Sequence, residues 1–129
     1  MKEDVRKIYH AFSGKLVGTK QMKYYVCETL FLMPEEIINR ITSNCWFMSS
    51  MDDAWAFTFT GNDLKDQHLI FLSDDLLRQS PTQIRYSIAH EIGHVILGHR
   101  NSVLERQTKR EINKQEGAAD LFAKQFVSF

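Results

Sequence analysis

The segment His90-Glu91-Ile92-Gly93-His94 places two histidines four residues apart, with a glutamate directly after the first. In a helix, four residues advance the chain by about 6 Å and turn it by about 400°, so both imidazoles lie on nearly one face and can reach one ion. Glu91 lies about 100° from His90, too far round to ligate beside both histidines. It is well placed to take a proton from a water at the metal's open position. The motif therefore predicts a metal site with His90 and His94 as ligands and Glu91 as general base.

A catalytic zinc ion needs a third protein ligand that still leaves one position open for water. Three downstream residues are candidates: His99, Glu111 and Glu116. Glu116 begins an E-x-x-x-D pattern with Asp120, and helical spacing places these two carboxylates on one face. Glu116 can then ligate the metal while Asp120 accepts the distal N–H of a ligating histidine. We predict Glu116 as the third ligand and one Zn²⁺ as the cofactor, with Mn²⁺ as an alternative divalent ion.

The residues that follow the motif do not fit another zinc-peptidase class, the metzincins. A metzincin continues its motif with glycine and histidine where this chain has Leu97 and Arg100, and no methionine follows Met51 to form a Met-turn. That class is disfavoured. Tyr86 and His99 are candidates for contact with the substrate or the transition state, because both lie near the motif. Isolated histidines are usually structural, and this is the prediction for the remaining candidates, His10 and His68.

The helix that carries the motif has clear start and stop signals. Ser80 suits the N-cap, Pro81 the first helical position and Gln83 the third position of a capping box, while Gly98 suits a left-handed C-terminal cap. This predicts an active-site helix over residues 80–98. A second helix, over 111–127, carries the third ligand, and its apolar stripe consists of Ala119, Phe122, Ala123 and Phe126.

The rest of the chain supplies a small scaffold. Residues 1–44 contain three apolar stripes with helical spacing, and residues 45–73 contain strand patterns. Residues 54–60 alternate as a half-buried strand does, 61–67 read as a hairpin loop, 68–72 as a buried strand, and 46–48 as a shorter one. We predict an α+β fold: one small zincin-like domain over 1–129 with N-terminal helices, a mostly antiparallel sheet, and the two site helices.

Composition limits the classes of partner. The chain has 129 residues with a formal net charge of zero, so nothing in its bulk charge favours direct binding to nucleic acid or to an anionic membrane. The charged start is not followed by an apolar signal segment, and the apolar runs are too short to span a bilayer. Cys27 and Cys45 form no C-x-x-C pair and read as reduced, buried small hydrophobes. We expect a cytoplasmic protein.

Residues 84–94, IRYSIAHEIGH, and 116–123, EGAADLFA, resemble the ImmA/IrrE family of zincin-like metallopeptidases. The resemblance spans residues 54–126. It implies a gluzincin-type fold, a metal held by His90, His94 and Glu116, and cleavage of a cytosolic regulatory protein, often a repressor from a phage or mobile element. The rival hypothesis is a non-proteolytic module, in which zinc ties two helices together and an exposed surface binds a partner in a toxin–antitoxin or repressor pair.

Overall fold

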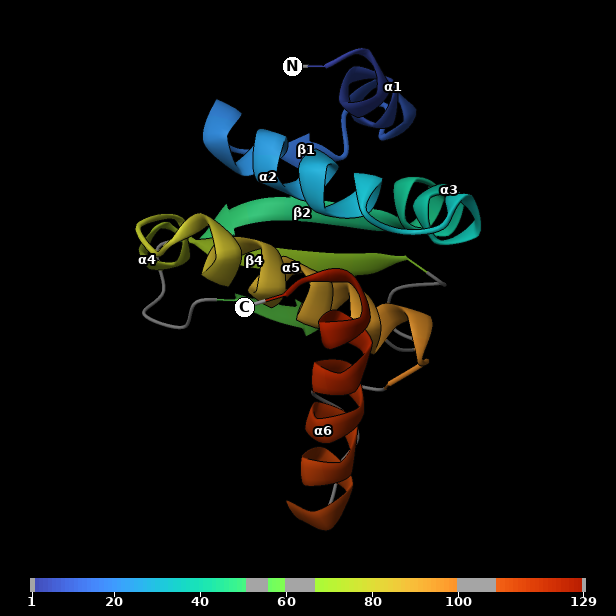
Figure 1. The fold of residues 1–129 in the computed structure, drawn as a ribbon, viewed down its shortest axis with the longest axis vertical. Coiled ribbons are helices and arrows are strands. Elements are labelled where there is room, and N and C mark those ends of the chain that lie inside the picture. Colours follow the sequence, from blue (N-terminus) through green and yellow to red (C-terminus); the bar gives the residue numbers. More distant parts are fainter. Residues whose placement is uncertain (1, 51–55, 60–66, 100–108, 129) are drawn as a thin grey trace.

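The structure is a computed structural model that describes residues 2–50, 56–59, 67–99 and 109–128. These residues form six helices and one four-stranded sheet, so the predicted α+β class is confirmed (Figure 1). In chain order the elements are α1 (Glu3–Ala11), β1 (Leu16–Val17), α2 (Lys20–Phe31), α3 (Glu35–Asn44), β2 (Cys45–Ser50), β3 (Ala56–Phe59), β4 (His68–Ser73), α4 (Asp74–Leu77), α5 (Pro81–Ile96) and α6 (Lys109–Phe126).

The three N-terminal helices appear where the apolar stripes predict them. α1 buries Val5 and Ile8, and the chain then turns through Ser13 and Gly14, both at positive φ. The Thr19 side chain caps α2 by accepting a hydrogen bond from the Met22 N–H at 3.1 Å, which satisfies one of the N–H groups that have no partner within the helix. Two short elements have no counterpart in the sequence-based prediction: β1, and α4, which begins at the capping residue Ser73.

The sheet has the strand order β1-β2-β4-β3. β3 pairs with β4 in the antiparallel sense expected for a hairpin, although most of the predicted loop over 61–67 lies outside the described residues. β1 pairs with β2 and β2 with β4 in parallel. The prediction of a mostly antiparallel sheet is therefore wrong in its pairing. Alternating side chains determine which face of a strand is buried, whereas they leave open which strands become neighbours.

One face of the sheet forms the core with the helices. Phe47 on β2 and Ile70 on β4 are partners in the ladder, and both are fully buried. The Phe12 ring contacts Phe47 edge-on, with ring centroids 5.7 Å apart. The buried strand predicted over 68–72 is only partly confirmed, because Leu69 and Phe71 on the other face of β4 are half-buried.

α5 crosses this core and begins at the predicted cap. The Ser80 hydroxyl accepts a hydrogen bond from the Gln83 N–H at 3.2 Å, but the Gln83 amide bonds the Ser87 hydroxyl at 3.0 Å, where a capping box would return it to Ser80. Only half of the capping box forms. One face of α5 packs into the core through three almost completely buried residues, Ile84, Ile88 and Ile92. His90 and His94 lie on a different face of the same helix.

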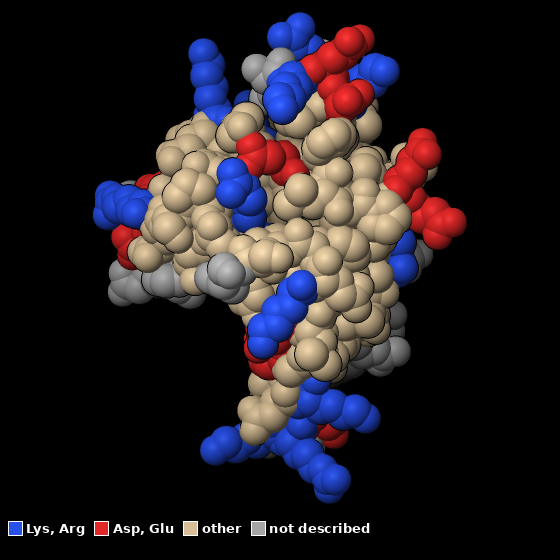
Figure 2. All heavy atoms as spheres, viewed as in Figure 1, with Lys and Arg blue, Asp and Glu red and all other residues tan. Residues whose placement is uncertain are grey.

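The C-terminal part of α6 packs chiefly on α5, and the N-terminal part of α6 projects from the rest of the molecule (Figure 1). The contact is close because Gly93 has no side chain: a Cβ there would lie 3.2 Å from the Phe122 Cβ. Ala119 and Ala123 on α6 are fully buried, so small residues let the two helices approach. Lysine and arginine side chains surround the projecting end of α6 (Figure 2).

Candidate metal centre

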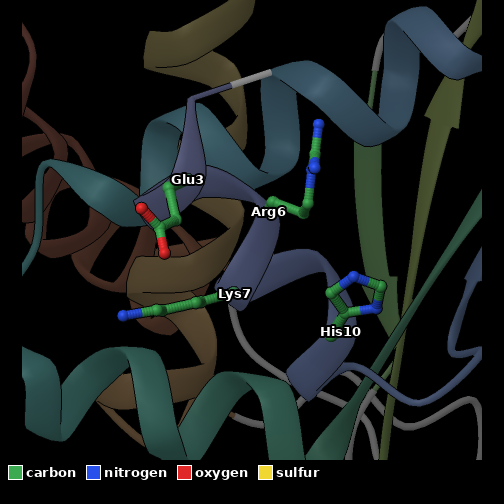
Figure 3. A pocket seen from close by; sticks show the side chains of 4 residues that line it. All are labelled: Glu3, Arg6, Lys7 and His10. Atoms are coloured by element: carbon green, nitrogen blue, oxygen red, sulfur yellow. The ribbon is translucent and has the colours of Figure 1, made fainter.

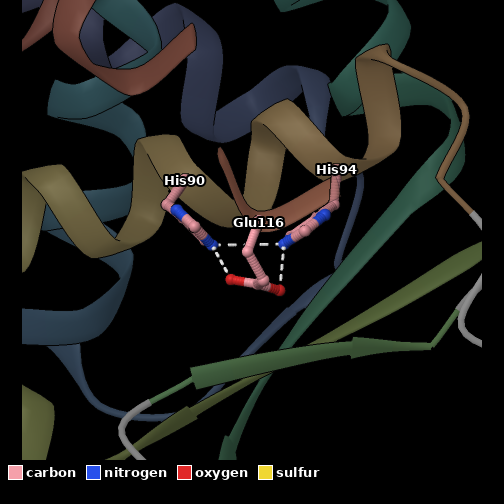
Figure 4. A group of neighbouring side chains, drawn as sticks. All are labelled: His90, His94 and Glu116. Carbon is pink, nitrogen blue, oxygen red and sulfur yellow. Dashed lines mark hydrogen bonds and ion pairs between the residues drawn. The ribbon is translucent and has the colours of Figure 1, made fainter. Parts of the chain in front are cut away.

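His90 and His94 on α5 face Glu116 on α6 (Figure 4). The His90 Nε2 lies 2.8 Å from the Glu116 Oε2, and the His94 Nε2 lies 3.0 Å from the Oε1. The two Nε2 atoms are 3.1 Å apart. One potential ligand atom from each residue lies within 4.8 Å of the other two, which is close enough for all three to hold one ion.

This group of side chains fits the metal that the sequence predicts. Two imidazole nitrogens and one carboxylate form a ligand set that zinc takes in catalytic sites, where a fourth position stays open. The imidazoles are mostly buried, with side chains 14% and 13% exposed, whereas the Glu116 side chain is 53% exposed. The centre thus opens toward solvent on the side of α6. The two imidazoles are therefore shielded from water more than the Glu116 carboxylate is.

Asp120 lies one turn after Glu116 and holds the other nitrogen of His90. Its Oδ1 lies 2.8 Å from the His90 Nδ1 and accepts a hydrogen bond from the Tyr86 hydroxyl at 2.8 Å. If the His90 Nε2 faces a metal, the Nδ1–H donates to Asp120, which fixes the tautomer and the orientation of the ring. The E-x-x-x-D pattern anticipated this position of the two carboxylates.

The Tyr86 hydroxyl is directed to Asp120, a contact that no pattern in the sequence predicts. Burial, followed by the hydrogen bond to Asp120, raises the pKa of Tyr86 to about 12. The phenol therefore stays protonated near neutral pH and donates to the carboxylate. A role of Tyr86 in supporting Asp120 follows from this geometry more directly than the predicted contact with substrate, which stays a prediction.

His99 lies beside His94. Its Nδ1 is 2.8 Å from the His94 Nδ1, and the two rings meet edge-on with centroids 5.1 Å apart. Burial lowers the pKa of both imidazoles, against the opposing effect of Glu116, and this favours the neutral form that can ligate a metal. His99 is not part of the group of three potential ligands.

The remaining candidates lie in different surroundings. Glu91 is buried, at 7% exposed, and directly follows His90 on α5. Glu111 is exposed in the first turn of α6 and does not belong to the ligand group.

The two remaining histidines lie away from this group. His10 lies on α1 and lines a surface hollow with Glu3, Arg6 and Lys7 (Figure 3). His68 is half-buried at the start of β4. Within the described ranges neither of these two histidines belongs to a metal-binding group.

Comparison with known proteins points to a peptidase. A family model described as Peptidase U49 matches residues 82–128, which contain almost all of α5 and the whole of α6. The part of the chain that builds the candidate centre is therefore similar to a peptidase family. No curated protein and no solved structure matches the chain. The more specific likeness to the ImmA/IrrE family stays a prediction.

In the four described ranges, no helix combines the length and the apolar character needed to cross a bilayer.

Proposed function

We propose that the protein is a zinc-dependent metalloendopeptidase, with His90, His94 and Glu116 as metal ligands and Glu91 as general base. The observation that carries this proposal is the convergence of the histidines of α5 with Glu116 of α6, inside the segment that is similar to a peptidase family. A zinc ion held there would polarise the scissile carbonyl and make water a better nucleophile near neutral pH.

Neighbouring side chains would transfer the proton and orient the metal ligand. Glu91 takes a proton from the attacking water and returns it to the leaving amine. Asp120, itself held by Tyr86, accepts the Nδ1–H of His90 and keeps its Nε2 toward the ion. α5 thus supplies the group that carries the proton from water to the amine, and α6 supplies the acceptor that orients His90.

The substrate would be a protein segment in an extended conformation. β3 is an edge strand of the described sheet, and α5 packs beside it, so a peptide added to this edge would run near the centre. Backbone hydrogen bonds would hold the peptide, while pockets for alternate side chains would select it. We propose a cytosolic regulatory protein of the repressor type as the class of substrate, with neither nucleic acid nor membrane as a direct partner.

Glu91→Gln tests the assignment, because it removes the base while keeping the shape of the side chain. We expect this variant to retain zinc at the wild-type stoichiometry and to lose cleavage of candidate repressor proteins by at least about a hundredfold. Glu111→Gln is the matched control, since it changes an exposed carboxylate outside the ligand group, and it should cleave as the wild type does. Equal cleavage by the Glu91→Gln variant would refute the catalytic role. Zinc bound with no cleavage by the wild type would support the non-proteolytic alternative.

A further inference from the structure

The turn that ends α5 brings His99 back against His94. Gly98 has a φ of +71°, in the left-handed region where glycine has no steric penalty. The Gly98 N–H donates to the Val95 carbonyl at 3.1 Å, and the His99 N–H donates to the His94 carbonyl at 2.9 Å. These two bonds form a Schellman motif, which fixes the position of the residue that follows the glycine.

His99 is thus joined to His94 twice, once through the backbone and once through the rings. The ring contact joins the two Nδ1 atoms at 2.8 Å. In a hydrogen bond between two imidazole nitrogens, one must carry the proton and the other must accept it. The His94 Nε2 faces the Glu116 Oε1 at 3.0 Å, on the side where the ion would bind. When that Nε2 ligates an ion, the proton of the neutral His94 ring lies on Nδ1, and His99 is the acceptor.

We propose that His99 is a positioning residue that orients His94 toward the metal by accepting its Nδ1–H. This inference rests on the proposed metal site and assigns His99 to neither of its predicted roles, third ligand or substrate contact. Each ligating histidine then has its own acceptor: Asp120 from α6 for His90, and His99 from the cap of α5 for His94. The second acceptor comes from the turn that ends the same helix as its ligand, whereas the first comes from α6.

The acceptor can be tested separately from the bulk of the side chain. His99→Asn keeps an acceptor, since its Oδ1 is bonded to Cγ as the Nδ1 of histidine is, whereas His99→Leu has a similar branched shape and no acceptor. Loss of a hydrogen-bonding partner of a ligand typically weakens metal binding by about 10- to 100-fold. We expect a loss of that size for His99→Leu, while His99→Asn should stay within about threefold of the wild type.

Zinc affinity is measured by competition with a chromophoric chelator, and thermal unfolding of each metal-free variant serves as the folding control. Wild-type zinc affinity in the His99→Leu variant would overturn the proposal, as would equal weakening in both variants. His90→Ala separates this result from failure of the site: if His90→Ala abolishes zinc binding and His99→Leu leaves it unchanged, the ligand assignment survives and only the role of His99 is wrong. A wild-type protein that binds no zinc would overturn both.

Discussion

Gly93 is the position at which one added methyl group most directly tests the packing that brings Glu116 to the histidines. A Cβ at Gly93 would lie 2.9 Å from the Phe122 Cδ1 and 3.2 Å from both its Cβ and its Cγ. The ring edge can rotate away, but the Cβ is attached to the backbone of α6. Accommodating Gly93→Ala therefore requires α6 itself to move by a few tenths of an ångström.

Two opposing effects set the size of the change in stability. Overpacking of this kind typically costs about 1–3 kcal/mol. Replacing a helical glycine by alanine gains about 1 kcal/mol through helix propensity. Gly117→Ala isolates the second effect, because a Cβ at Gly117 would have no heavy atom within 4 Å. We expect Gly117→Ala to be stabilised by about 1 kcal/mol, and Gly93→Ala to be about 1–3 kcal/mol less stable than that control.

The assay is urea denaturation of the two metal-free variants and the wild type, followed by zinc titration of each. Displacement of α6 should weaken zinc binding in the Gly93→Ala variant, since Glu116 moves with the helix, and should leave Gly117→Ala unchanged. If both variants gain the same stability, Phe122 repacks without cost, and the close approach of α5 and α6 does not position Glu116.

Two further predictions concern the thiols and the pH dependence of folding. Burial raises the pKa of Cys27 and of Cys45 to about 12, and both side chains are inaccessible, so we expect neither to react with a thiol reagent near pH 8 until the protein unfolds. Rapid labelling of the native protein would contradict their burial. Burial also lowers the pKa of His94 and His99 from 6.5, so below that pH the unfolded chain takes up protons that the folded metal-free protein does not. The free energy of unfolding, from denaturation at several pH values, should therefore fall as the pH drops below about 6.5; an unchanged or rising value would contradict the shifts.

The sequence predicted the site helices well because their signals are local and agree with one another. Ser80, Pro81 and Gly98 bound the first helix, and the spacing of the histidines, and then of Glu116 and Asp120, follows from helical periodicity alone. A glycine at position 93 leaves room for another segment to come close to this turn, and the structure shows that Phe122 of α6 occupies that space.

What the sequence could not predict depends on contacts between distant segments or on competition between partners. The parallel pairing of β2 with β4 is one such feature, since no pattern within either strand specifies its neighbour. The Tyr86–Asp120 bond is another, because it joins residues on two helices. The Gln83 side chain could bond either to Ser80, in a capping box, or to Ser87, and in the structure it bonds to Ser87. The contact of His99 with His94 could have been predicted, because a Schellman cap at a glycine brings the next residue back to the last turn of the helix.

The way α6 is attached gives any bound ion a second effect. α6 packs chiefly on α5, yet it supplies both Glu116 and Asp120. Thermodynamic linkage then requires that an ion strengthen the docking of α6 by the same free energy by which docking strengthens binding of the ion. For an ion that binds only when α6 is docked, a free concentration of about 100 times the dissociation constant would stabilise the docked state by about 2.7 kcal/mol. The free concentration of such an ion would thus govern the fraction of molecules in which α6 is docked, so that metal supply would act on the population of the folded chain as well as on its chemistry.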